Sequence, residues 1–294
     1  MEARISQAEV LKKLVMWGAG DSFIRAMVLT SSRARQDGSV DSLSDFDVVL
    51  GVADVKRFEQ EDDWLSRYGR PLVHWRDQGQ KYGFTTCFCG VLYADYTKID
   101  YSIWPDALLL RISTAAILPD NLDVGYRVLL DKDGRTSEWK PPSYTAHIPL
   151  KPTEAEYHAL IEAFWWETTY VAKNLRRDEL LFAKLCLDYE IKLNILRRLL
   201  EWRIEIEHNW RLRPGVGGRG FKRLLSGNVW SELARSYVGS GLEENWNALF
   251  LTVSLFRQIA REVADALGYT YPQQMDDEIT AYLRAIQKTS LHQA

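Results

Sequence analysis

The chain has 294 residues, of which 46% are hydrophobic and 26% charged, and its formal net charge is −3 at pH 7. This length is enough for one large or two medium domains with substantial cores. The slightly acidic balance excludes the strong basic field of a nucleic-acid-binding protein and suits a polycationic small substrate. The sequence has no apolar run of about twenty residues, so we expect no membrane span.

The cysteines and the N-terminus favour a cytoplasmic protein. The three cysteines are Cys87, Cys89 and Cys186, and an odd number without paired spacing argues against a disulfide framework. Cys87 and Cys89 have no second pair of metal ligands nearby, so free thiols in a strand are favoured over a zinc site. The first residues, Met1–Arg4, do not show a secretory signal pattern.

The first half of the chain alternates short apolar strands with helices. We expect helices near 6–19, 54–68 and 105–110, and strands at 24–29, 46–52, 71–75, 85–94, 96–103 and 126–130. Apolar runs of this length, bounded by turn residues, are typical of buried strands. Their mixture with helices predicts an α+β fold class, with a mixed sheet in the N-terminal half.

A proline-containing stretch, residues 141–149, separates this half from a helical second half. Thr153 and Glu156 then form the signature of a capping box, which marks the start of a helix. We therefore expect two domains, 1–145 and 146–294.

The second half has the periodicity of helices throughout. We expect one helix over residues 243–267 and another over 180–206, where the helical periodicity is clearest. Its apolar residues recur mostly at spacings of three and four: Leu185, Ile191, Ile195, Leu196, Leu199 and Trp202. The glycine-rich segment 214–220 lacks the Lys-Ser/Thr of a phosphate-binding loop and is interpreted as a connection. This half predicts a bundle of α-helices.

Asp45, Asp47 and Asp100 point most directly to chemistry. Residues two apart in a strand share a face, so Asp45 and Asp47 point the same way. Asp100 lies in another predicted strand and can meet them from a neighbouring position. Converging carboxylates repel one another, and Mg²⁺ compensates their charge while taking further ligands from substrate phosphates. The alternative is three acidic residues at strand ends that face water.

A turn of small residues comes before the Asp-x-Asp strand. The predicted strand 24–29 is followed by Ser31, Ser32 and Arg33, and a polar connection leads to the two carboxylates. Small residues let the backbone approach a ligand closely, and N–H groups in such a turn favour phosphate. Alone, the serines would indicate an ordinary turn or helix cap. With the carboxylates, they indicate phosphoryl or nucleotidyl transfer.

This order of features resembles the nucleotidyltransferase superfamily and, more closely, the aminoglycoside 6-adenylyltransferases, which modify streptomycin. The residues that carry the resemblance extend over most of the chain: Arg25-Ala26, Ser32-Arg33, Asp45-Phe46-Asp47-Val48, Asp63-Trp64-Leu65, Tyr68-Gly69, Lys98-Ile99-Asp100, Phe164-Trp165-Trp166, Tyr170-Val171-Ala172-Lys173, Glu179-Leu180, Trp202, Glu244-Asn245-Trp246, Leu249-Phe250 and Leu255-Phe256-Arg257. Ser31 is a departure, because the family usually has Gly there. Its β-carbon would crowd the phosphate approach or require a strained φ.

The resemblance implies a polymerase-β-like nucleotidyltransferase domain and a helical substrate-binding domain, with ATP and two Mg²⁺ ions between them. Asp45 and Asp47 would hold the metals. Asp100 would ligate the catalytic metal or accept a proton as general base. The 6-hydroxyl of streptomycin would attack the α-phosphorus, pyrophosphate would leave, and the modified antibiotic would be inactive, giving resistance.

Further contacts are expected for both substrates. Predicted phosphate contacts are Ser31, Ser32, Arg33, Lys173 and Arg177. The guanidinium groups of the acceptor need carboxylates and aromatic faces, for which the candidates are Trp104, Trp166, Glu167, Asp178, Glu179 and Asp188. The alternatives are core packing for most of the aromatic residues and a solvated helix face for at least half of the acids.

Two other functions stay open. The chain could be a nucleotidyltransferase for a different small acceptor, or a catalytically inactive nucleotide-binding module, which the serine at position 31 suggests. The expected partners are ATP and an aminoglycoside, without nucleic acid or membrane, and the chain would act as a monomer or homodimer.

Overall fold

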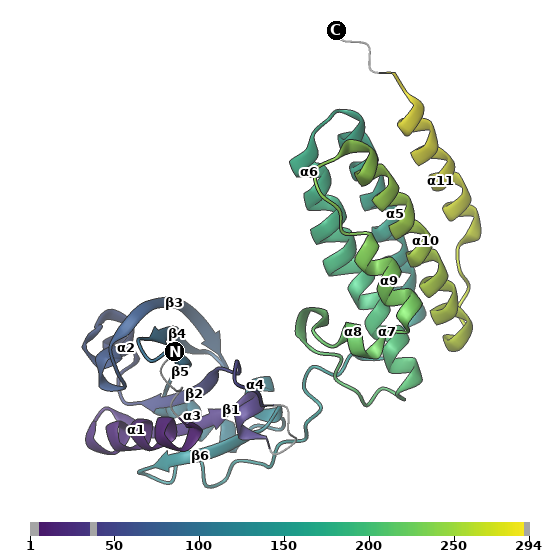
Figure 1. Ribbon diagram of the computed structural model, residues 1–294. Helices are drawn as coiled ribbons and strands as arrows, with labels where there is room; N and C mark the ends of the chain where they lie inside the picture. The colour runs from purple at the N-terminus through teal and green to yellow at the C-terminus, as the bar shows by residue number, and fades with distance from the viewer. Residues whose placement is uncertain (1–5, 36–39, 291–294) are drawn as a thin grey trace. The chain divides into compact units, whose positions relative to one another are not determined.

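The computed structural model describes residues 6–35 and 40–290. Contacts divide the chain into two compact units, Met1–Ala146 and His147–Ala294. Met1–Arg4 and residues 36–39 of the polar connection lie outside the described residues. The first unit has a mixed sheet with helices, and the described part of the second contains helices as its regular elements, which confirms the α+β class (Figure 1).

The elements of the first unit, with η for short 3-10 helices, are in chain order α1 (Gln7–Gly20), β1 (Ile24–Thr30), η1 (Ser31–Ala34), β2 (Phe46–Val52), α2 (Val55–Gln60), η2 (Asp63–Arg67), β3 (Pro71–Lys81), β4 (Phe84–Tyr93), β5 (Lys98–Pro105), α3 (Asp106–Ser113), α4 (Asp120–Asp123) and β6 (Tyr126–Asp131). The six predicted strands are confirmed, and β3 runs well beyond its predicted end at residue 75.

The predicted helix over 54–68 is wrong, because the chain breaks it into α2 and η2. Glu61 between them has extended backbone angles. In a continuous helix Trp64 would point about 120° away from Phe58, since each residue turns by about 100°. The break brings both rings into one core, where the Trp64 indole donates a hydrogen bond to the Phe58 carbonyl at 3.1 Å.

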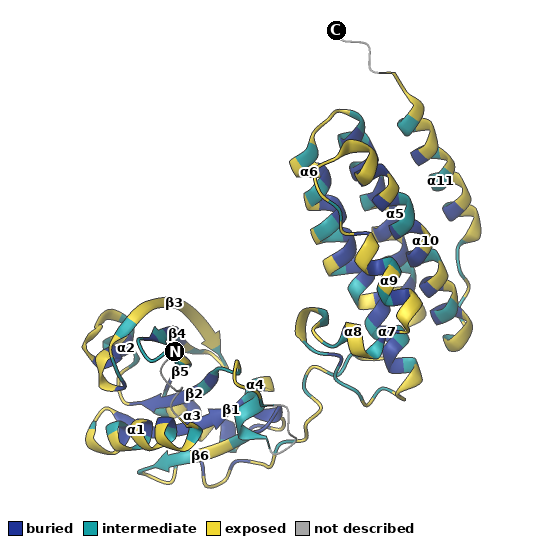
Figure 2. Ribbon diagram, in the orientation of Figure 1, coloured by how far each residue is buried: buried dark blue, intermediate teal, exposed yellow. Residues whose placement is uncertain are grey.

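In the described part of the first unit, the strands form a six-stranded sheet in the order β3-β4-β5-β2-β1-β6. β2 and β5 are parallel, and the other neighbours are antiparallel. Side chains alternate between two cores, and the inner strands β1 and β2 are buried along most of their length (Figure 2). Val48 and Tyr101 pack with α1 on one face, whereas Val49 and Trp104 pack with α3 on the other.

The elements of the second unit are α5 (Glu154–Arg176), α6 (Leu180–Lys184), the π-helix η3 (Leu185–Leu196), α7 (Arg197–Glu207), η4 (Val216–Gly218), α8 (Phe221–Leu224), α9 (Gly227–Arg235), α10 (Leu242–Leu267) and α11 (Gln273–Lys288). Thr153 and Glu156 form the predicted capping box at the start of α5. The glycine-rich segment is a connection that carries only η4, as predicted.

The predicted helix over 180–206 is continuous in direction but changes type. Its middle, η3, is a π-helix, whose wider turn the α-helical periodicity did not predict. Ile191 and Leu199 are buried, as expected, whereas Leu185 is 48% exposed. Leu185 is the first residue of η3 and lies six residues before Ile191, which is not a whole number of π-helical turns, so the two side chains leave the helix on different sides.

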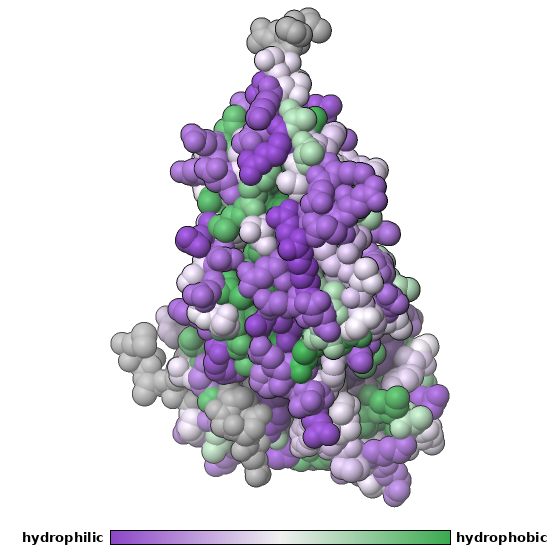
Figure 3. Space-filling model, turned by 90° about the vertical axis from the view of Figure 1, so that its right-hand side faces the viewer, coloured by the Kyte–Doolittle hydropathy of each residue, from purple (hydrophilic) through white to green (hydrophobic). Residues whose placement is uncertain are grey.

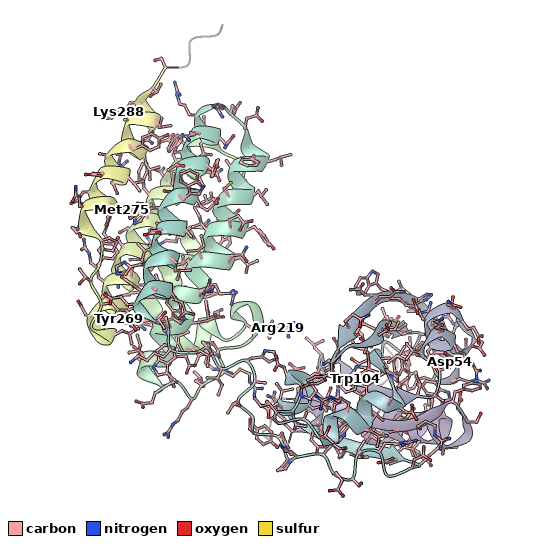
Figure 4. The ribbon with its side chains drawn as sticks, turned by 180° about the vertical axis from the view of Figure 1, so that it is seen from behind. Asp54, Trp104, Arg219, Tyr269, Met275 and Lys288 are labelled. Atoms are coloured by element: carbon pink, nitrogen blue, oxygen red, sulfur yellow. The ribbon has the colours of Figure 1, made fainter. Side chains whose placement is uncertain are left out.

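A half-buried ion pair connects helix α11 to helix α10. The Arg257 guanidinium donates two hydrogen bonds to the carboxylate of Asp276, and the Tyr271 hydroxyl donates a third at 2.9 Å. Tyr269, at one end of the α10–α11 connection, donates to the Pro152 carbonyl at 2.7 Å (Figure 4). The outward face of α11 is largely hydrophilic (Figure 3).

The structure also bears on the membrane span and the cysteines discussed from the sequence. Within the described residues, none of the helices combines the length and apolar character that crossing a bilayer requires. Cys87, Cys89 and Cys186 are buried free thiols, as predicted.

Candidate active site

The parallel pairing of β2 and β5 places Asp47 directly beside Asp100. Thr30, the last residue of β1, pairs with Asp47 on its other side. Because alternate residues share a face, both carboxylates lie on the face that carries Val49 and Trp104. Helix α3 covers that face near the C-terminal ends of the two strands. The carboxylates occupy the N-terminal ends of β2 and β5, outside this core.

Lys98 joins two of the three carboxylates. Its ammonium lies 2.7 Å from Asp45 Oδ2 and 2.9 Å from Asp100 Oδ2. The other oxygen of Asp100, Oδ1, is buried and has no hydrogen-bond partner within the described residues. Gly90 of β4 pairs with Asp100, and a β-carbon there would lie only 3.0 Å from Oδ1. The site therefore contains an acceptor that protein donors do not satisfy.

Asp47 has a strongly perturbed carboxyl group. Burial raises the pKa of Asp47 to about 6, and the nearby negative charges of Asp100 and Asp45 act in the same direction. A hydrogen bond from the Ser31 side chain and the positive charge of Lys98 oppose the rise. Asp100, which lies far from Asp45 and Asp47 in the sequence, is therefore close to both of them in space.

Ser31 has a left-handed backbone conformation. Its φ is +61°, in the left-handed region that favours glycine. The expectation of a strained φ is therefore confirmed. The Ser31 N–H donates to the Gly125 carbonyl at 3.1 Å, and Ser31 is the first residue of the 3-10 helix η1. The hydroxyl group, absent in glycine, is what reaches Asp47.

Arg33 braces the connection that leads into β2. Its guanidinium donates to the carbonyls of Ser44 and Asp45, and Nη1 donates to the Gln7 side chain at 3.0 Å. The guanidinium also lies 4.0 Å from the ring centre of Phe46. These contacts fix the backbone that presents Asp45. A phosphate contact by Arg33 stays a prediction.

The donor set fits a hard divalent cation. The described residues contain no group of three His, Cys, Asp or Glu side chains already arranged around a metal position, and the Lys98 ammonium bridges Asp45 and Asp100 instead. The unpartnered Asp100 Oδ1 and the carboxylates near Asp47 nevertheless leave the cluster short of positive charge. Oxygen-only ligands of this kind suit Mg²⁺ or Mn²⁺.

The predicted acceptor residues belong to both units, Trp104 to the first and the other five to the second. Trp104 is buried in the core of the first unit at the C-terminal end of β5, with the Lys81 ammonium 4.8 Å from its ring centre (Figure 4). Trp166 is 62% exposed on α5. Asp178 and Glu179 are exposed at the turn between α5 and α6, and Glu167 lies about 14 Å along α5 from the end of that helix at Arg176, at 1.5 Å per residue.

Two predicted acids differ in their surroundings. Asp188 is paired with Lys184 at 2.6 Å and Lys192 at 2.8 Å, so two cations already compensate its charge. Glu167 has no such cation among the influences on its carboxyl group. Burial, and then the nearby carboxylate of Glu190, raise the pKa of Glu167.

The remaining predicted residues lie near the end of α5. Lys173 lies 5.7 Å from the Tyr170 ring centre, and Arg177 is the exposed residue that ends the helix. Their contacts with phosphate, and that of Ser32, stay predictions. Sequence reasoning gave no role to Lys98 or Glu190. The spacing of two between Lys98 and Asp100 could have revealed the first.

Comparison with known proteins agrees over nearly the whole chain. A sequence model of the streptomycin adenylyltransferase family matches residues 5–286. The aminoglycoside 6-adenylyltransferase of Bacillus subtilis (strain 168) is 29% identical over 290 residues, 96% of this chain and 98% of that protein. The Campylobacter jejuni enzyme of the same name is 28% identical over 284 residues, 95% of this chain and 94% of that protein.

A protein of known structure is also similar to this chain over nearly its whole length. The crystal structure of an aminoglycoside 6-adenyltransferase from Bacillus subtilis is 25% identical, covering 97% of this chain and 100% of that one, with a TM-score of 0.44. Because the family match extends over almost every described residue and includes the carboxylate cluster, the chain belongs to the streptomycin adenylyltransferase family.

Proposed function

We propose that this protein transfers the AMP group of ATP to a hydroxyl of an aminoglycoside, with the 6-hydroxyl of streptomycin as the acceptor and antibiotic resistance as the result. The observation that carries the proposal is the cluster formed by Asp47 and Asp100 on adjacent parallel strands and by Asp45, which directly precedes the first of these strands. Membership of the family supports adenylyl transfer, and the names of the relatives support the class of acceptor.

Each carboxylate has a role in this proposal. Asp45 and Asp47 would hold Mg²⁺, and two ions are expected. When bound, Mg²⁺ supplies charge compensation at the α-phosphate and the departing pyrophosphate. Asp100 would share the second ion or take the proton of the attacking hydroxyl. Its unpartnered Oδ1 supports a ligand or proton role beyond the ion pair with Lys98.

The reaction forms one bond and breaks another. The acceptor oxygen bonds to the α-phosphorus, while the bond from that phosphorus to the oxygen bridging the β-phosphate breaks. Pyrophosphate leaves, and the hydroxyl proton passes to a base at the site. Ser32 and the start of η1 would contact the outer phosphates. Ser31 would position Asp47 through its hydrogen bond and define the turn beside the nucleotide.

The experiment is incubation of the purified protein with ATP, Mg²⁺ and a panel of aminoglycosides, with products read by mass spectrometry. Streptomycin should gain one AMP group, and NMR of the product should place it on the 6-hydroxyl. Asp47→Asn is the control and should form no product. Modification of a different acceptor would contradict streptomycin as the substrate, while adenylyl transfer would still hold as the reaction. Absence of product with every acceptor would contradict the proposal.

The role in resistance has a separate test. Expression of the chain in a streptomycin-sensitive bacterium should raise the inhibitory concentration of streptomycin, and the Asp47→Asn variant at equal abundance should not. An equal increase for both proteins would contradict resistance by adenylylation.

A further inference from the structure

Lys98 stands where a cation is needed in the carboxylate cluster. Its ammonium contacts both Asp45 Oδ2 and Asp100 Oδ2 within 3 Å. Lys98 and Asp100 lie two residues apart on β5, so the strand directs both side chains from the same face. A lysine in this position compensates part of the charge of the carboxylates in the absence of a metal.

The bridge contributes little to holding the sheet together. The side chains of Lys98 and Asp45 are 45% and 40% exposed, and ion pairs at such positions usually add little stability. The ladder between β2 and β5 is complete through its backbone pairing from Phe46 onward. The Lys98 ammonium is easily released and lies beside carboxylates that suit a metal ion. Its position is therefore better explained by exchange with a metal ion than by a role in stabilising the sheet.

We propose that Lys98 is an exchangeable counter-ion of the active site. It bridges Asp45 and Asp100 in the nucleotide-free protein, yields their oxygens to the divalent cation that accompanies ATP, and then binds the triphosphate. This inference rests on the proposed function, because it requires a metal–nucleotide substrate. An ammonium and a divalent cation on the same two oxygens repel each other, so the lysine must move when the metal enters.

The surroundings give the released ammonium a place and a partner. Lys98 and Asp45 line a hollow of about 240 Å³ at the exposed end of β5, with Leu43 and Tyr96 among the other lining residues. The flexible four-carbon stem of lysine lets the charge move while the backbone stays in the sheet. Phosphate oxygens are ordinary partners for a lysine ammonium. The same residue therefore protects the empty site and contributes to nucleotide binding.

The first test is Lys98→Met, which removes the charge and keeps most of the side-chain length. Mn²⁺, followed by its electron paramagnetic resonance signal, should bind the nucleotide-free variant roughly tenfold more tightly than wild type, within the usual range of coupling between sites. The affinity for ATP with Mg²⁺ should fall. Lys56→Met, on an exposed lysine of α2, is the matched control and should change neither affinity.

The second test uses the wild-type chain and covers the case in which the variant does not fold. The acylation of Lys98 by an amine-reactive reagent, read by peptide mass spectrometry, should be slow without metal, faster with Mg²⁺ and slow again with Mg²⁺ and a non-hydrolysable ATP analogue. Lys56 should react equally in all three states. Unchanged Mn²⁺ affinity in a folded variant, or no change at Lys98 on adding Mg²⁺, overturns the proposal.

These outcomes are distinguishable from failure of the proposed function. Mn²⁺ that binds wild type and the variant equally overturns the role of Lys98 alone. A wild-type protein that binds no Mn²⁺, with or without nucleotide, overturns both. Tighter Mn²⁺ binding by the variant without transfer to any aminoglycoside supports Lys98 and counts against the acceptor.

Discussion

Replacement of Asp47 by Asn should stabilise the metal-free protein while it abolishes transfer. Asp47 is ionised in the unfolded chain above its ordinary pKa of 3.8, whereas burial and the neighbouring Asp100 raise the pKa of the folded carboxyl to about 6. Between these two values the unfolded state releases a proton that the folded state keeps, so stability falls as the pH rises through this window. Asparagine has the same shape, can still accept the hydrogen bond from Ser31, and has no charge to bury.

The pKa difference fixes the size of the effect. Each unit corresponds to about 1.4 kcal/mol, so the ionised Asp47 carboxylate costs the fold about 3 kcal/mol at pH 7 and about 1 kcal/mol at pH 4.5. The gain from Asp47→Asn should therefore approach these two values and shrink as the pH is lowered. A gain independent of pH would have a cause other than ionisation.

The assay is urea unfolding in the presence of EDTA at pH 7 and pH 4.5, followed by tryptophan fluorescence. Asp45→Asn is the matched control, because Asp45 is 40% exposed and paired with Lys98, and its removal should change stability by less than about 1 kcal/mol. Saturating Mg²⁺ and ATP should stabilise wild type much more than Asp47→Asn. An Asp47→Asn protein that is no more stable than wild type at pH 7 would refute the reasoning.

Three further predictions follow from single contacts. Glycine adopts a positive φ without strain, whereas alanine does not. Ser31→Gly should therefore be about 1 kcal/mol more stable than Ser31→Ala in urea unfolding. Asp276→Asn leaves the half-buried charge of Arg257 without its carboxylate and should cost about 2 kcal/mol, measured in the same way. Glu167→Gln should weaken streptomycin binding by about 2 kcal/mol in calorimetry, whereas Asp178→Asn, exposed at a turn, should have little effect.

Local patterns predicted the elements better than their interruptions. Apolar runs indicated every strand of the sheet, although only the inner strands are buried between two layers, whereas β3 and β6 at the edges are largely exposed or half-buried. The break at Glu61 could not be predicted, since it serves a tertiary requirement, the packing of Trp64 against Phe58. The π-helix from Leu185 to Leu196 was also not predicted. The spacing of apolar residues identifies the buried face of a helix, but it does not distinguish the hydrogen bonds of a π-helix from those of an α-helix.

The sequence predicted the residue types of the site, but not the strand register and the side-chain contacts that join them. Alternation along strands placed Asp45 and Asp47 on one face, but the register of Asp47 beside Asp100 depends on a parallel pairing between strands separated by about fifty residues. Neither the raised pKa of Asp47 nor the bridge made by Lys98 follows without that register. The positive φ of Ser31 was anticipated only because the resemblance supplied glycine as the usual residue.

The acids of the second unit illustrate why composition alone does not identify a cation site. A carboxylate is available to a guanidinium group only if no protein cation already holds it. Asp188 is held by Lys184 and Lys192, so a ligand would have to displace a lysine. Burial, together with the nearby carboxylate of Glu190, instead raises the pKa of Glu167. A bound cation would relieve their repulsion as well as form its own hydrogen bonds. Of the predicted acids, Glu167 therefore has the electrostatic surroundings best suited to a cationic acceptor.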